Sequence, residues 1–99
     1  MDGNLAKNEA QEVEMAGDQA RLLKALGNPG RLRMLRLLIA APRQVSDIEE
    51  ALGLGQAYVS QQLARLRSEG IVEGERSGRT VLYRVVDARV EPVLDAICR

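Results

Sequence analysis

The chain has 99 residues, no net formal charge, no histidine and one cysteine. This length allows one small domain, and an apolar content of 45% with two tyrosines as its only aromatic residues predicts a core of Leu, Val, Ile and Ala. Because one thiol without imidazoles leaves few metal ligands and no nucleophile beside a base, we expect no metal, no cofactor and no enzyme active site. Without a membrane-spanning apolar run or a signal-peptide pattern, the sequence predicts a soluble cytoplasmic protein.

The charges are unevenly distributed along this neutral chain. Residues 1–20 carry five acids and one lysine, whereas residues 21–43 carry six Lys or Arg and no acid. Salt screens charges beyond roughly 8 to 10 Å, so a local basic surface can attract phosphates on a neutral protein. The pattern is equally compatible with solvated helix faces, and both interpretations stay open.

Two helices are predicted before residue 43. Residues 1–12 are polar and are expected to form a flexible tail, with one domain over residues 13–99. From Val13 apolar residues recur every three or four positions, which predicts a helix to about Gly27. Asn28-Pro29-Gly30 breaks that helix, and a second stripe from Leu32 to Ile39 ends before Pro42.

The next segment has the pattern of a helix-turn-helix. Residues 45–52 and 56–68 have helical apolar spacing and flank the break Gly53-Leu54-Gly55. On the second helix, Gln61 and Arg65 lie opposite the apolar stripe, where polar side chains could reach base edges in a major groove. The candidate DNA-binding residues of this helix are Gln56, Tyr58, Ser60, Gln61, Gln62 and Arg65.

Beyond Gly70 the apolar period changes from 3.6 to 2. Strands over residues 71–76 and 80–86 flank Ser77-Gly78-Arg79, which predicts a β-hairpin. Arg76, Arg79 and Thr80 at its tip are candidate DNA contacts, although the tip could be polar for solubility alone. A last helix is expected to begin between Arg89 and Glu91. The fold class is therefore mainly α with a small β-hairpin, an α+β winged helix-turn-helix.

Apolar stripes on the first and last helices exceed what so small a core can cover. Pairing them across a two-fold axis would bury them, which predicts a homodimer. The candidate interface residues are Val13, Ala16, Ala20, Leu23, Val90, Val93, Leu94 and Ile97.

Two segments of the chain resemble a known family. Residues 22–35, LLKALGNPGRLRML, are similar to the "LKALxxPxRLxIL" motif of the ArsR-type winged-helix repressors, and residues 59–72 to their "VSxHLxxLRxAGLV" motif. The resemblance implies a dimer that binds an inverted-repeat operator in double-stranded DNA and is released by an inducer. A winged-helix protein-interaction module is the alternative from another functional class.

The departures from the family's motifs concern sensing. Gln44-Val45-Ser46-Asp47-Ile48 replaces a "CVCDL" metal motif, and Asp87-Ala88-Arg89 lacks the imidazole of a second one, so we expect no metal sensing and interpret Asp87 as a helix cap. The chain looks closest to the thiol-sensing branch, in which Cys98 would be one sensing cysteine while Arg36 aligns with the other. Cys98 is then either a sensor acting alone or a small residue at a dimer interface, and the inducer is unknown.

Overall fold

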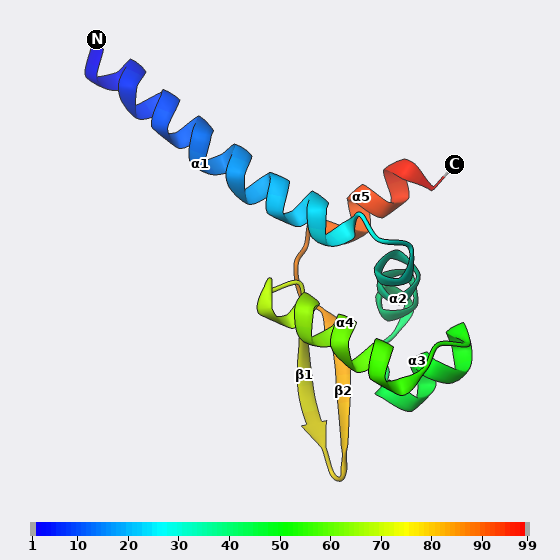
Figure 1. Ribbon diagram of the computed structural model, residues 1–99. Coiled ribbons are helices and arrows are strands. Elements are labelled where there is room, and N and C mark those ends of the chain that lie inside the picture. Colours follow the sequence, from blue (N-terminus) through cyan, green and yellow to red (C-terminus); the bar gives the residue numbers. More distant parts are fainter. Residues whose placement is uncertain (1, 99) are drawn as a thin grey trace.

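The computed structural model describes residues 2–98, with side chains from residue 8 onward. Its elements in chain order are α1 (Asp2–Leu26), α2 (Pro29–Ala40), α3 (Val45–Leu52), α4 (Gln56–Ser68), β1 (Val72–Ser77), β2 (Thr80–Val85) and α5 (Val90–Ile97). Figure 1 shows α1 as a long rod that projects from the remaining elements, with α4 and the hairpin at the end of the molecule away from its N-terminus. This arrangement confirms the predicted winged helix-turn-helix. Among the described helices, none is both long and apolar enough to cross a membrane.

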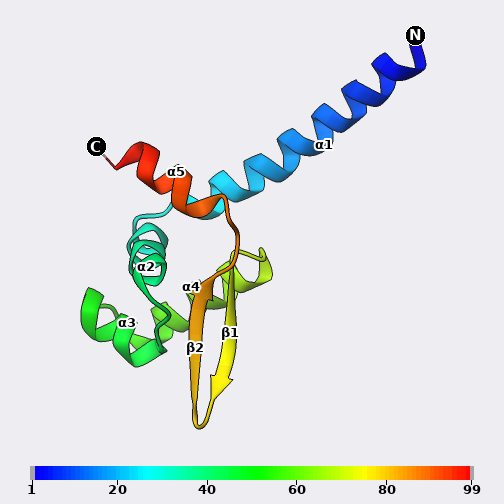
Figure 2. The same ribbon diagram turned by 180° about the vertical axis from the view of Figure 1, so that it is seen from behind.

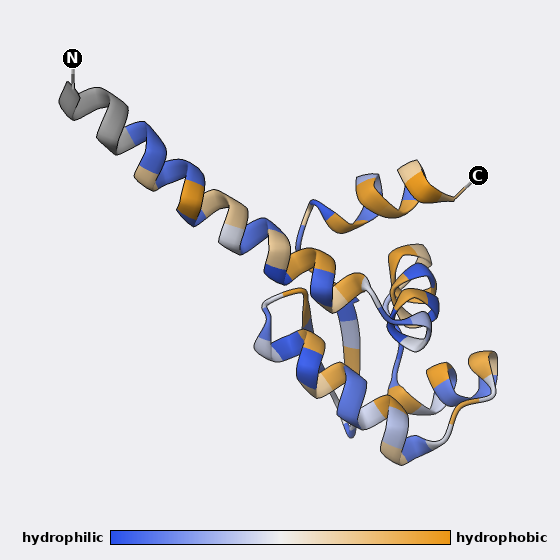
Figure 3. Cartoon of the chain, turned by 45° about the horizontal axis from the view of Figure 1, so that its top comes forward, coloured by the Kyte–Doolittle hydropathy of each residue, from blue (hydrophilic) through white to orange (hydrophobic). Residues whose placement is uncertain are grey.

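The first helix begins at Asp2, so the predicted start near Val13 was wrong. Residues 5–12 are mostly Leu, Ala, Lys, Glu and Gln, which favour a helix even where nothing packs against it. The absence of an apolar stripe in residues 1–12 indicates that this segment has no face to pack against a core. It does not exclude a helix. In Figure 3 the coloured part of α1 that follows the grey residues is mainly hydrophilic and stands apart from the other elements. The flexibility expected of residues 1–12 stays a prediction.

The core is shared by the end of α1, the four other helices and the start of β1. Its buried side chains are Leu22, Ala25, Leu26, Met34, Leu35, Leu38, Ile48, Val59, Leu63, Leu66, Ile71, Val72, Val90 and Leu94. Val90 and Leu94 were expected at a dimer interface, yet they are 0% and 3% exposed within this one chain. We correct that expectation for these two residues: Val90 and Leu94 close the chain's own core, in which α5 contacts α2. A repeating apolar pattern cannot tell which partner covers each of its residues.

Caps and glycines set the ends of the central helices. Asn28 precedes α2 with extended backbone, its Oδ1 accepts a hydrogen bond from Arg31 N at 3.0 Å, and Pro29 opens the helix. Gly53 ends α3 with φ 66°, a left-handed conformation in which glycine carries no Cβ penalty. The boundaries predicted for the helix-turn-helix therefore match those observed.

The hairpin is an antiparallel pair in which Val72 lies opposite Val85 and Ser77 opposite Thr80. Gly78 has φ 64° in the turn, and Thr80 Oγ1 donates to Ser77 O at 2.9 Å. The base of the hairpin is fixed by a third piece of chain, since Arg43 N donates to Tyr83 O at 3.0 Å and Tyr83 N to Arg43 O at 2.7 Å. The strands are thus tied to the loop before α3 (Figure 2).

Candidate nucleic-acid interface

Helix α4 has one buried side and one exposed side. Val59, Leu63 and Leu66 are at most 1% exposed and pack into the core. We call the opposite side the outer face; its exposed residues are Ala57, Ser60, Gln61, Ala64, Arg65 and Ser68. Gln56 is the first residue of α4 and is also exposed. The outer face offers amide, hydroxyl and guanidinium groups to a partner, as the sequence predicted for Gln61 and Arg65.

Two of the residues grouped with that face lie instead on the flank of α4 that faces α2. Gln62 is half-buried, and its Oε1 accepts a hydrogen bond from Arg31 Nη1 at 2.8 Å. The Tyr58 hydroxyl is 3.4 Å from Asn28 Oδ1, and its ring covers Gly30, where an added Cβ would lie 2.9 Å from Tyr58 Cζ. Spacing on the helix placed both residues near the outer face, but the position of α2 cannot be read from spacing.

The tip of the hairpin carries cations without carboxylate partners. In the part of the chain that the structure describes, Arg76 and Arg79 are exposed and form no ion pair. Further down the hairpin, Arg84 pairs with Glu73 at 2.8 Å and with Glu75 at 3.5 Å, so its charge is offset. The positive potential of the hairpin is therefore concentrated at its tip.

The sequence analysis missed a hollow between α4 and β2. It has a volume of about 370 Å³ and is lined by Ser60, Ala64, Arg67, Ser68 and Tyr83. Arg67 lies seven residues after Ser60 and so on the same side of the helix, a periodicity that could have identified it. The hollow adds an exposed guanidinium and hydroxyl groups between the outer face and the hairpin.

A second exposed surface, which we call the α1–α5 surface, is apolar. Val13, Leu23 and Ile97 are 73%, 58% and 62% exposed. Ala16 and Ala20 are exposed, Val93 is half-buried, and Met15, which was not predicted, is 54% exposed. An open hollow of about 540 Å³ separates the two helices and is lined by Gln19, Leu22, Leu23, Ala88, Arg89, Pro92 and Val93. Figure 3 shows hydrophobic residues along α5 and the neighbouring end of α1.

Arg89 lies between two carboxylates at the edge of this surface. Its Nη2 is 2.7 Å from Asp87 Oδ2, and its Nη1 is 2.8 Å from Asp18 Oδ2. The hydrogen bond from Arg89 lowers the pKa of Asp87, and Asp87 Oδ1 also accepts Arg89 N at 2.9 Å in a turn just before α5. The N-cap of α5 is Arg89 and, in the described structure, no side chain caps the helix, so the capping role expected of Asp87 was wrong. Among the described residues, no group of three or more His, Cys, Asp or Glu is arranged to hold a metal ion.

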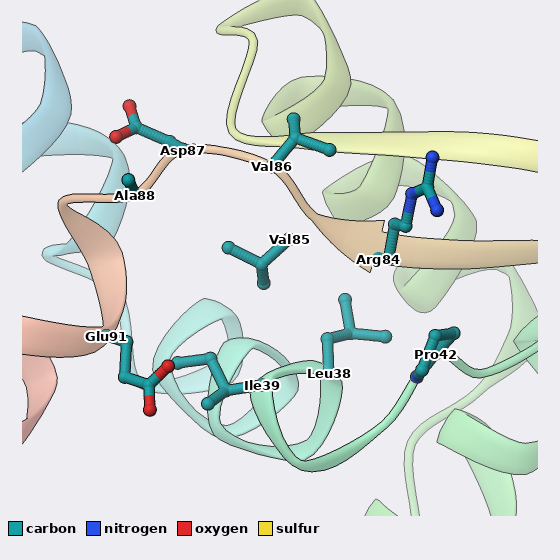
Figure 4. Close-up of a pocket in the computed structure, with 9 residues that line it drawn as sticks. All are labelled: Leu38, Ile39, Pro42, Arg84, Val85, Val86, Asp87, Ala88 and Glu91. Carbon is teal, nitrogen blue, oxygen red and sulfur yellow. The ribbon is translucent and has the colours of Figure 1, made fainter.

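Two further features bear on a possible inducer. An open hollow of about 450 Å³ is lined by aliphatic residues of α2 and β2, among them Leu38 and Val85. In Figure 4 the charged ends of Arg84 and Asp87 point away from these two side chains. Arg84 and Asp87 are engaged in ion pairs with Glu73 and Arg89, which leaves Glu91 as the remaining charged residue of the lining. Cys98 is exposed directly after α5, where its N–H donates to Leu94 O at 3.0 Å.

A helix-turn-helix with a polar outer face, followed by a hairpin with cations at its tip, defines a winged-helix DNA-binding protein. Residues 28–74 match the family model described as "Bacterial regulatory protein, arsR family". The chain belongs to this family and is a DNA-binding transcription regulator, which agrees with the resemblance noted in the sequence.

Individual relatives agree with this assignment. The transcriptional regulator NmtR of Mycobacterium tuberculosis is 40% identical over 84 residues, which cover 85% of this chain and 70% of that protein. The crystal structure of the transcriptional repressor BigR from Xylella fastidiosa superposes with a TM-score of 0.81 at 34% identity, covering 90% of this chain and 91% of that one. A homodimeric winged helix-turn-helix domain from Mycobacterium bovis, described as a possible ArsR-family regulator, superposes with a TM-score of 0.79 at 32% identity. The match covers 89% of this chain and 82% of that one.

Proposed function

We propose that the chain is a homodimeric transcriptional repressor that binds an inverted-repeat operator in duplex DNA. The observation that carries this proposal is the exposed polar outer face of α4, together with two arginines at the hairpin tip, Arg76 and Arg79, that form no ion pair with the described residues. BigR, described as a repressor, and the homodimeric M. bovis domain support repression and dimerisation.

Base reading is assigned to the outer face. Gln61 can form two hydrogen bonds with adenine and Arg65 two with guanine, and each such pair contributes about 1 to 3 kcal/mol of discrimination. Ser60 and Gln56 lie on the same helix, beside the groove edge that these residues would contact. Thr80 is a weaker candidate, because its hydroxyl proton is donated within the turn.

Phosphate contacts are assigned to the hairpin tip and to the hollow behind α4. Arg76 and Arg79 would approach the backbone beside the half-site, and Arg67 the phosphates between helix and hairpin. Such contacts release counterions, so they make affinity strongly dependent on salt.

The dimer would form through the α1–α5 surface. Val13, Ala16, Ala20, Leu23, Val93 and Ile97 remain the proposed interface residues, with Met15 added. A two-fold axis there would place two copies of α4 about 34 Å apart, on successive major grooves of one DNA face.

The test is selection from a pool of randomised duplexes, followed by titration of the enriched sequence at several salt concentrations. A repressor dimer should enrich an inverted repeat, and the logarithm of its affinity should fall linearly with the logarithm of salt concentration. A protein-interaction module would enrich no sequence, and that result would refute the proposal.

The inducer is a separate question. Cys98 is an exposed thiol one residue after Ile97, at the end of the proposed dimer surface. The Cys98 thiolate could attack the outer sulfur of a persulfide RSSH, which forms a Cys98–S–SH group and releases RS⁻. The modified side chain is larger by one sulfur atom at the end of the proposed dimer surface. A small molecule bound elsewhere, or no inducer, is the alternative that a Cys98 variant would distinguish.

A further inference from the structure

Arg31 is the one charged residue buried among those whose side chains the structure describes, with 8% of its surface exposed. Its Nε donates to Ala25 O at 2.6 Å, and its Nη2 lies 3.4 Å from Lys24 O. Its Nη1 donates to Gln62 Oε1 at 2.8 Å. One guanidinium on α2 thus joins the last turn of α1 to the middle of α4.

The charge of Arg31 is offset by carbonyl oxygens. No carboxylate pairs with it in the described part of the chain. The carbonyls in the last turn of α1 lack the usual partner four residues on and carry the negative partial charge of the helix dipole, which suits a cation. Of the two that face Arg31, Lys24 O also accepts a hydrogen bond from Gly27 N at 3.2 Å. Since a buried charge is costly unless it is hydrogen-bonded, each acceptor matters, and Gln62 Oε1 is the side-chain acceptor among them.

A second contact lies one helical turn earlier on the same flank of α4. Tyr58, four residues before Gln62, covers Gly30, and its hydroxyl lies near Asn28 Oδ1. Apart from these contacts, α4 packs mainly against α3 and β1. The junction between α1 and α2 therefore holds this flank of α4 at two points.

We propose that Arg31 and Gln62 are positioning residues for DNA recognition, whose hydrogen bond sets the angle of α4 relative to α1. The inference rests on the proposed function. Because α1 belongs to the proposed dimer surface, this angle also sets the separation of the two copies of α4 and hence the half-site spacing that the dimer accepts. Gln62 then acts through α4 rather than by contacting a base.

The experiment compares Gln62→Leu, which removes the acceptor, with Gln62→Glu, which keeps an acceptor of similar shape opposite Arg31. The probes are the inverted repeat that the wild type enriches and two versions with the centre lengthened or shortened by one base pair. We expect Gln62→Leu to bind the parent repeat about tenfold more weakly, to discriminate less between the three spacings and to keep its salt slope. Gln62→Glu should retain both wild-type affinity and wild-type spacing preference.

The outcomes separate positioning from contact. Gln62→Glu that loses affinity together with a changed preference at one base pair would show that Gln62 touches DNA and would overturn the inference. Wild-type affinity and spacing preference in Gln62→Leu would overturn it as well, while leaving the proposed function intact. A wild-type chain that enriches no duplex would refute the proposed function, and this inference with it.

Discussion

The guanidinium of Arg89 meets the carboxylate of Asp18 at 2.8 Å, although 71 residues separate them in the chain. The contact joins the middle of α1 to the turn before α5, and these two helices carry the exposed apolar surface. The same guanidinium also pairs with Asp87. The three side chains therefore link α1 to the start of α5, the two helices that form the α1–α5 surface.

The Asp87 carboxylate makes stability depend on pH. Hydrogen bonding to Arg89 lowers the pKa of Asp87 below its ordinary value of 3.8, so the folded state binds its proton less readily than the unfolded chain. This stabilisation is complete above pH 3.8 and is lost as pH falls through the lower folded pKa. We expect Asp87→Asn to reduce the free energy of unfolding at pH 7 and to weaken its decline on acidification, as measured by urea titrations at several pH values. An equally steep decline in Asp87→Asn would contradict this.

Replacing Arg65 should affect DNA recognition and not folding. Its side chain is on the outer face of α4 and has no side-chain hydrogen bond in the described structure. Arg65→Ala should cost about 1 to 3 kcal/mol of specific binding and relax the preference at one base pair in each half-site, with an unchanged melting temperature. Titration against the enriched duplex and its single-base variants checks this; unchanged affinity at fixed salt would remove Arg65 from the base-reading set.

Substitutions of the hairpin arginines should affect DNA affinity differently, depending on whether a carboxylate pairs with the arginine. Arg79→Ala removes a tip cation and should weaken binding to all duplexes alike, reducing the salt slope by about one unit. Arg84→Ala is the matched control, because Glu73 and Glu75 already offset that charge. If both substitutions changed the slope equally, the tip would have no special part in phosphate contact.

The dimer prediction now separates residues that the sequence grouped together. Leu23→Glu and Ile97→Glu add charge to an exposed apolar surface and should give folded monomers that bind the inverted repeat weakly. Leu94→Ala should instead destabilise the fold by about 2 to 5 kcal/mol, because that side chain is buried. Sedimentation and circular dichroism distinguish the two classes, and a Leu23→Glu chain that remains dimeric at micromolar concentration would refute the interface.

Thiol sensing, if it operates, depends on Cys98 alone. An organic persulfide should release the wild type from its operator while Cys98→Ser stays bound, with no loss of helix signal in either protein. Operator titrations with and without the persulfide provide the comparison. Retention of DNA by the treated wild type would assign Cys98 a packing role and direct the search to a small-molecule inducer.

The sequence predicted the helix-turn-helix to the residue because its signals are local: Gly53 and Gly55 break the helices, and the apolar spacing on either side identifies their buried sides. The sequence did not predict which element packs against a given face of a helix, because that depends on the tertiary structure. Val90 and Leu94 proved to be core while Ile97 of the same stripe is exposed, and the flank carrying Tyr58 and Gln62 proved to face α2.

The two backbone hydrogen bonds between Arg43 and Tyr83 have a consequence for the DNA itself. They join the base of the hairpin to the loop before α3, so the hairpin cannot swing freely to follow a duplex of the wrong shape. The duplex must then adapt, and the energy of narrowing or bending a groove depends on its base sequence. The protein should therefore bind operators with stiff A-tracts beside the half-sites and operators with flexible pyrimidine–purine steps there with different affinities. This difference would arise at positions that no side chain contacts.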